Sequence, residues 1–275
     1  MTVLAATGHG RTVTAGLVGA ALILATLLGA WGFGEAGIAP DFTARNLPPS
    51  LAHPFGTDPM GRDMLARSLH GLTLSLRVGL IAAGLSVAIA LAVARASGLG
   101  RAGDAAAGFV TDATLAMPHL MLLMLVSFVL GGGATAVIVA VAVSHWPRLA
   151  RVLRAELMQL RGAPYVEASR AFGRSRGFIL RRHILPHLVP QMLVGFLLMF
   201  PHAILHEAAL TFLGFGLEPS RPAIGVMLAE AMRHLGAGRW WLALFPGLAL
   251  VVLVLAFDAI AGNLRRLADP REGQL

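Results

Sequence analysis

Long apolar segments alternate with shorter polar ones along the chain. A helix that crosses the hydrocarbon core of a membrane needs about 20 mostly apolar residues. Six segments are candidates. They lie at about residues 13–33, 72–94 and 108–131, in a fourth segment that follows "GGGAT" and ends near 146, and at about 187–211 and 240–262. The pattern therefore predicts an all-α integral membrane protein with six transmembrane helices. Because six is an even number, both termini are expected on the same side of the membrane.

The first apolar segment is longer than the core of a secretory signal peptide usually is, so we expect it to remain as an uncleaved anchor. The run "GGGAT" at 131–135 predicts a tight turn between the third and fourth spans. The expected organisation is a single transmembrane domain over residues 1–275, with an anchor span at about 13–33. The core spans then cover about 72–262.

The composition supports a membrane protein and excludes several classes of enzyme. Hydrophobic residues make up 56% of the 275 residues, charged residues only 13%, and the mean hydropathy is +0.73. The chain has no cysteine, which excludes disulfides, a thiol nucleophile and a cysteine metal site. It also has no lysine, so it cannot form a P-loop, whose lysine contacts the nucleotide phosphates. Any energy from ATP must come from a partner.

The formal net charge of +8 comes from arginines, and their positions predict the orientation of the chain. Cytoplasmic loops of membrane proteins carry an excess of basic residues. The segment between the fourth and fifth spans contains two glutamates and nine arginines. The arginines are Arg148, Arg151, Arg154, Arg161, Arg170, Arg174, Arg176, Arg181 and Arg182. We expect this segment and both termini to be cytoplasmic. Because these arginines lie between apolar spans, a nucleic-acid partner is not expected.

The basic segment, about 147–186, also contains the pattern of a short helix. Pro164 suits the first helical position, Glu167 falls near the positive N-terminus, and Gly173 can end the helix in the left-handed conformation. An apolar patch is expected from Tyr165, Val166, Ala168, Ala171 and Phe172. A second helical run then leads to Pro186 at the start of the fifth span. The pattern predicts a short helix that lies across the inner face of the membrane.

The letters "EASRAFG", followed by "HILP", resemble the Glu-Ala-Ala…Gly…Leu-Pro loop of bacterial ABC-importer permeases. The resemblance implies the type I importer permease fold, in which this loop's helix docks into a groove on an ATPase subunit. It assigns ATPase coupling to Tyr165, Glu167, Ala168, Ser169 and Gly173. Ser169 stands where the family usually has a second alanine, a replacement of one small residue by another.

A second stretch, "HPFGTDPMGRDMLARSLHGLTLSLRVGL" at 53–80, is similar to the C-type permeases for dipeptides, oligopeptides and nickel. Its residues Gly56, Asp58, Gly61, Arg62 and Asp63 predict an extracytoplasmic turn. We favour a structural role, in which they cap the second span and pair an arginine with a carboxylate. The alternative is direct contact with a binding protein.

The fifth span contains His202 and His206, which share one face of a helix because they are four residues apart. They are expected near the outer mouth, where neutral imidazoles at this spacing can share a metal ion such as nickel. Alternatively, both histidines form hydrogen bonds between helices. The stretches "HAILHEAALTFLGFGL" and "SHW" resemble nickel-type permeases more than peptide permeases. The expected cargo is therefore nickel or a metal–chelator complex, with a dipeptide or oligopeptide as the alternative.

Two other classes fit the residues less well. The stretch "HEAAL" begins like a zinc-protease helix, but Leu210 stands where the second histidine would be needed, which argues against an intramembrane metalloenzyme. A proton-driven carrier would need buried acids to relay charge, and the spans are expected to lack them. We therefore expect a transport subunit rather than an enzyme.

The resemblance implies a set of partners in the bacterial inner membrane. They are a homologous permease subunit, two ATP-binding cassette subunits, an extracytoplasmic substrate-binding protein and membrane lipid. No cofactor is expected on this chain, because ATP and magnesium would bind the partner subunits. Transport would proceed by alternating access, with the short helix at 165–173 carrying the movement of the ATPases into the spans.

Overall fold

The structure is a computed structural model that describes residues 2–268. In this range the chain is helical, and its only β-type pairing is an isolated bridge between Thr57 and Asp63. Five helices are long and apolar enough to cross a membrane. They are α1 (Thr2–Phe33), α2 (Met64–Ser97), α5 (Gly133–Arg161), α8 (Leu185–Phe212) and α10 (Trp241–Ala268).

The third expected span is broken. Instead of one helix over 108–131, the chain forms α3 (Arg101–Ala116) and α4 (His119–Val129), which meet at an angle of 97°. Pro118 explains the break, because the residue before a proline is driven out of the helical conformation, and Met117 has an extended backbone with φ −79° and ψ 136°. Counted as one span, the bent pair brings the number of candidate crossings to six.

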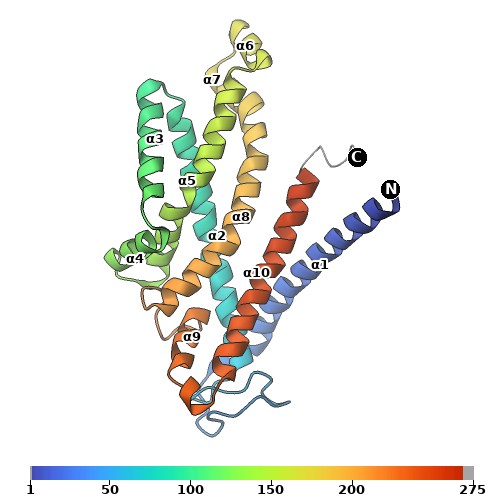
Figure 1. Cartoon of the computed structure of the whole chain (residues 1–275), viewed down its shortest axis with the longest axis vertical. Helices are drawn as coiled ribbons and strands as arrows, with labels where there is room; N and C mark the ends of the chain where they lie inside the picture. The colour runs from blue at the N-terminus through green and yellow to red at the C-terminus, as the bar shows by residue number, and fades with distance from the viewer. Residues whose placement is uncertain (1, 269–275) are drawn as a thin grey trace.

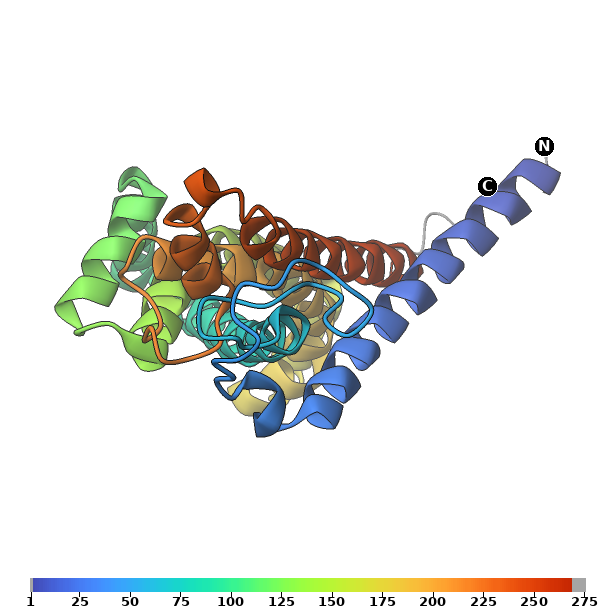
Figure 2. The ribbon, with the colours of Figure 1, turned by 90° about the horizontal axis from the view of Figure 1, so that it is seen from below.

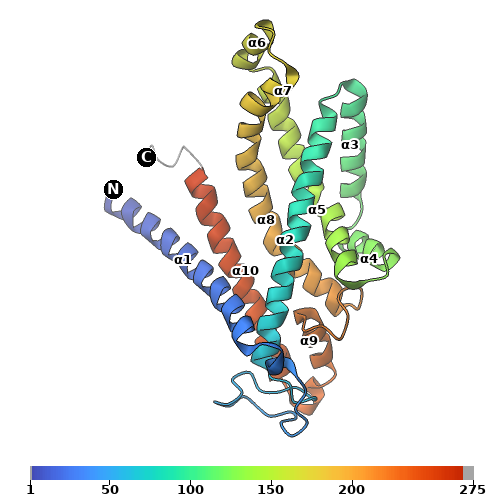
Figure 3. The ribbon, with the colours of Figure 1, turned by 180° about the vertical axis from the view of Figure 1, so that it is seen from behind.

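Three shorter helices lie at the ends of the bundle. They are α6 (Pro164–Ala171), α7 (Arg176–Ile179) and α9 (Ile224–Met232). Figures 1 and 3 show α6 and α7 at one end, and α9 at the other end with the irregular segment between α1 and α2. The start of α1 and the end of α10 point toward the α6 end. The two ends are called the α6 end and the α9 end below.

The spanning helices differ in how deeply they lie in the bundle. In the most apolar stretch of α5, 61% of the residues are buried, against 17% for α1 and 22% for α10. Seen from below in Figure 2, α1 leaves the bundle on the side opposite α3 and α4. The helices α2, α5 and α8 therefore form the centre, and α1 and α10 pair at the periphery. Their apolar outer faces suit contact with lipid or another apolar subunit.

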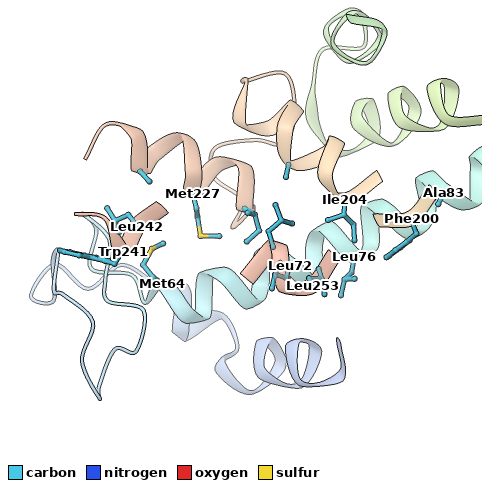
Figure 4. Packing of buried hydrophobic residues seen from close by; sticks show 14 residues of the cluster. Met64, Leu72, Leu76, Ala83, Phe200, Ile204, Met227, Trp241, Leu242 and Leu253 are labelled. Carbon is cyan, nitrogen blue, oxygen red and sulfur yellow. The ribbon is translucent and has the colours of Figure 1, made fainter. Parts of the chain in front are cut away.

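The core at the α9 end joins α2, α8, α9 and α10 (Figure 4). Met64, Leu76, Ile204, Met227 and Trp241 are among its buried members. The central helices approach closely because α2 carries small residues on its inner face, as membrane helices commonly do. A Cβ on Gly79, for example, would lie 3.0 Å from Ile204 Cγ1.

The expected turn after the third span is present. Gly131, Gly132 and Gly133 have φ values of 82°, 76° and 83°, a left-handed run that other residues adopt at a cost. The Gly133 amide donates a hydrogen bond to the carbonyl of Gly216, at 2.9 Å. The turn therefore connects α4 and α5 with the segment that follows α8.

Candidate coupling helix and translocation site

The fourth span continues much further than the apolar pattern predicts. The sequence suggested that it ends near residue 146, but α5 runs to Arg161 with Pro147 inside it. Beyond the proline, Leu149, Leu153 and Leu157 are buried. Their spacing of four places them on one face of the helix. This amphipathic extension carries the next segment away from the rest of the bundle, so only the later part of 147–186 forms a separate loop.

The short helix α6 is built as the sequence pattern predicts. Ala163 is extended at the N-cap, Pro164 occupies the first turn, and Glu167 follows in that turn. Gly173 has φ +72°, the conformation with which the chain leaves the helix. A Cβ on Gly173 would find no atom within 4 Å, so the requirement for glycine there comes from the backbone alone.

The expected apolar patch of α6 is divided between two environments. Val166 is fully buried against the leucines of α5 and against Ile179 and Ile184. Phe172 is 85% exposed and Tyr165 42% exposed. One side chain thus anchors α6 to the bundle, and the opposite face is open for another protein.

A second attachment joins α6 to α8. Ser169 Oγ lies 2.8 Å from His183 Nε2, and the Tyr165 ring centre lies 5.7 Å from that of His183. His183 belongs to a π-helical turn, Leu180–Ile184, that leads without a break into α8. The helix α6 is therefore attached to the turn that leads into α8 as well as to α5.

The predicted turn at the α9 end contains more charged groups than expected. Asp58 is 1% exposed, and its Oδ2 accepts hydrogen bonds from Arg62 Nε and Arg67 Nη1, both at 2.6 Å. Arg67, 2% exposed, also donates to Glu230 Oε2 at 3.1 Å. The pair of Arg62 with Asp58 follows the sequence prediction, whereas Arg67 and Glu230 were missed. An arginine in the first turn of an apolar helix was the available signal, because such a residue needs a partner.

The remaining residues of the turn fix the start of α2. Asp63 is its N-cap and accepts hydrogen bonds from the backbone amides of Leu65 and Ala66. Gly56 and Gly61 have φ values of 71° and 78°. A Cβ on Gly61 would collide with the backbone carbonyl of Asp41. The turn therefore has the capping geometry that its sequence favours.

The histidines are arranged differently from the predicted pair. His202 is exposed, and its Nδ1 lies 3.0 Å from the carbonyl oxygen of Leu198. His206 instead faces His119 of α4 and His145 of α5, and one ring nitrogen from each lies within 4.8 Å of the other two. The sequence analysis singled out "SHW", which contains His145, but did not connect it with His119 or His206. Their meeting depends on the bend before α4.

Glu207 takes no part in this histidine cluster. It is fully buried on the other side of α8, where Ser75 Oγ of α2 donates to its Oε2 at 2.5 Å. Thr211 Oγ1 donates to Oε1 at 3.1 Å. The spans were expected to lack buried acids, and Glu207 departs from that expectation because its carboxyl group joins α8 to α2.

Residues 81–271 match the family described as "binding-protein-dependent transport system inner membrane component". The chain belongs to this family. A putative peptide transport system permease protein of Brucella suis is 38% identical over 250 residues, which cover 91% of this chain and 84% of that protein. The dipeptide transport system permease protein DppC of Bacillus subtilis is 32% identical over 235 residues, covering 85% and 73%.

Two solved structures show the fold of this permease. An inward-facing structure of the MetNI methionine ABC transporter matches with a TM-score of 0.59 at 18% identity, covering 75% of this chain and 98% of that one. An amino acid ABC transporter with histidines matches with a TM-score of 0.57 at 18% identity, covering 73% and 94%. The chain therefore has the type I fold of ABC-importer permeases, and it is a transporter component.

Proposed function

We propose that this permease is a subunit of an ATP-driven importer for short peptides of the dipeptide class. The names of the relatives support this cargo, since those described above are peptide and dipeptide permeases. They support the peptide alternative better than the nickel cargo that the histidine spacing favoured. His202, one half of the pair that suggested nickel, lies outside the cluster of His119, His145 and His206.

The observation that carries the proposed mechanism is the construction of α6. It is anchored by Val166, linked to the turn before α8 by the bond between Ser169 and His183, and exposed at Glu167 and Phe172. An ATP-binding cassette subunit would grip this open face, and a second such subunit would bind the homologous permease. ATP and magnesium would stay on those subunits.

The orientation follows from the basic residues around α6. We place α6 and both termini in the cytoplasm, because arginines gather between α5 and α8. The α9 end then faces outward, where a substrate-binding protein would deliver peptide to the mouth formed with the second permease. ATP-driven movement of α6 and α8 would alternate access to that mouth.

Two measurements test the proposal. Cells that lack this permease should lose uptake of a radiolabelled dipeptide and regain it with the wild-type chain, while uptake of radioactive nickel at limiting concentration stays unchanged. The purified permease should retain a P-loop ATPase through affinity purification. Loss of nickel uptake with normal dipeptide uptake would refute the cargo, and a permease without an ATPase partner would refute the mechanism.

A further inference from the structure

Three histidine side chains from three different helices converge in the part of the bundle toward the α9 end. His119 begins α4, His145 lies within α5, and His206 lies less than two turns before the end of α8. The ring centres of His119 and His145 are 4.7 Å apart, those of His119 and His206 4.7 Å, and those of His145 and His206 5.0 Å. Each pair meets edge to face, and one nitrogen atom of each ring lies within 4.8 Å of a nitrogen of each of the other two rings.

Backbone hydrogen bonds fix two of these rings in the form that binds metals. His145 Nδ1 lies 2.9 Å from the carbonyl oxygen of Val141, and His206 Nδ1 lies 2.7 Å from that of His202. A carbonyl oxygen can only accept, so where these bonds form Nδ1 carries the hydrogen, and Nε2 of the neutral ring keeps its lone pair for a metal. Histidines that bind metals usually donate their second N–H to a carbonyl or carboxylate in this way.

The spacing suits a single ion after a small movement. The three ligand atoms lie within 4.8 Å of one another. Around an ion at about 2.1 Å from each nitrogen, tetrahedral ligands are about 3.4 Å apart. His119 has room to close this gap because it is exposed and stands at the first residue of α4, beside the bend.

The ligand chemistry selects the class of ion. Imidazole nitrogens suit zinc, nickel, copper and cobalt, whereas magnesium and calcium prefer oxygen. The adjacent carboxylate, Glu207, is turned toward Ser75 of α2 and supplies no oxygen here. The three neutral ligands would leave the charge of the ion uncompensated and at least one coordination position open. Such a site favours exchangeable binding over a closed structural cage.

We propose that His119, His145 and His206 bind one divalent transition-metal ion of the zinc, nickel and cobalt class. The ion joins α4 to α5 and α8, and thereby fixes the bent third span against the centre of the bundle. This site stands on the geometry of the three rings and does not depend on which cargo the importer carries. Both an aquo ion and a metal chelate with a free coordination position satisfy the same chemistry.

Cobalt(II) binding to the purified transporter complex tests the site, because its visible absorption reports the ligands. The wild-type complex should bind one cobalt ion per copy of this permease more than the complex with a cluster histidine replaced. His206→Gln and His119→Gln should each weaken binding more than about 10-fold, since even the outer partners of metal ligands contribute about 10- to 100-fold. His202→Gln is the matched control, because its ring makes the same bond to a carbonyl one turn earlier, outside the cluster. Equal weakening by His202→Gln would overturn the proposal.

Because this chain has no cysteine, an introduced cysteine allows a second measurement. Its thiolate changes the cobalt spectrum only if the residue binds the metal, and a purely structural role would not produce this change. His119→Cys replaces one nitrogen ligand with a thiolate at an exposed position, so cobalt(II) should gain a sulfur-to-metal absorption band that the wild-type complex lacks. Failure of this band to appear in a folded complex contradicts the site.

Cobalt is supplied both as the aquo ion and as its complex with glycylglycine, to identify the form that binds. Binding in either arm supports the site, and binding in neither overturns it. Dipeptide uptake by the same variants tests the proposed cargo separately from the metal.

Discussion

At the α6 end, a short helix is held by one buried valine and by a hydrogen bond between Ser169 and His183, with its outer face exposed. At the α9 end, an irregular turn is tied to α2 and α9 by a network of charged groups around the buried Asp58. The first arrangement leaves a surface for a partner, and the second satisfies its charges within the chain. The difference suits a movable element at the α6 end and a rigid one at the α9 end.

This difference has a physical basis. A carboxylate removed from water is costly unless it is paired and hydrogen-bonded, so the α9 end is stable in only one arrangement. The α6 contacts are fewer and mostly local, so a partner that grips the helix can move it without separating buried charges. Mutations at the two ends should therefore fail in different ways, by unfolding at the α9 end and by uncoupling at the α6 end.

The largest effect is expected at Asp58. Asp58→Ala removes the acceptor of Arg62, Arg67 and two backbone amides, and it leaves Arg67 buried with only the half-exposed Glu230. We expect a loss of about 3–5 kcal/mol in stability, the range measured when one partner of a buried ion pair is removed. Thermal unfolding in detergent and the amount of protein in the membrane measure it.

Asp41 provides a control for this variant. Its carboxylate is exposed and accepts hydrogen bonds from the amide and the hydroxyl of Thr43, the latter at 2.6 Å. Asp41→Asn should leave the thermal stability almost unchanged, as is usual for surface positions. Normal stability of Asp58→Ala would show that the network does not hold the α9 end.

Glu167→Lys should abolish uptake with little change in stability. The side chain is exposed in the first turn of α6, so reversing its charge costs the helix only about 0.3–1 kcal/mol. It also places a positive charge on the face that the ATPase would grip. Glu156→Lys, on α5 outside this face, should keep uptake. Membrane level, copurification of the ATPase and dipeptide uptake separate the outcomes, and full uptake by Glu167→Lys would remove α6 from the mechanism.

The two ends also differ in how far the sequence alone predicts them. The sequence signals that specify α6 are local, since Pro164 marks its start, Glu167 places a charge in its first turn, and Gly173 marks its end, all within ten residues. The α9 network is not local, because Arg67 and Glu230 are separated by 163 positions and are brought together by the packing of α2 near α9. Local patterns predict elements, whereas contacts between distant residues require the fold.

The histidine cluster shows the same limit. A spacing of four residues pairs His202 with His206 on one helix, but two other helices bring His119 and His145 to His206. Pro118 was a local sign that the third span would bend. The direction of the bend, and hence the meeting of the three rings, depends on how α4 packs on α5 and α8.

Substitutions at two glycines near α6 distinguish the effect of backbone conformation from the effect of packing. Gly173 has φ +72° and Gly177 does not have a positive φ, and a Cβ on either would find no atom within 4 Å. Gly173→Ala should therefore cost about 1 kcal/mol and reduce uptake by redirecting the chain after α6. Gly177→Ala, inside the helical α7, should be neutral or slightly stabilising. Dipeptide uptake and thermal unfolding distinguish the pair, and equal behaviour would show that the turn tolerates either conformation.

The smallest effect is expected at Ser169, where the family usually has alanine. Ser169→Ala removes the hydrogen bond to His183, which contributes about 0.5–1.5 kcal/mol, and keeps the buried contact of Val166. Dipeptide uptake should fall less than about twofold, because the covalent path from α6 through the π-helical turn into α8 is intact. Val166→Ala in parallel should reduce uptake more, because it removes the apolar anchor. If Ser169→Ala uncouples transport and Val166→Ala does not, the imidazole bond rather than packing connects α6 to the bundle.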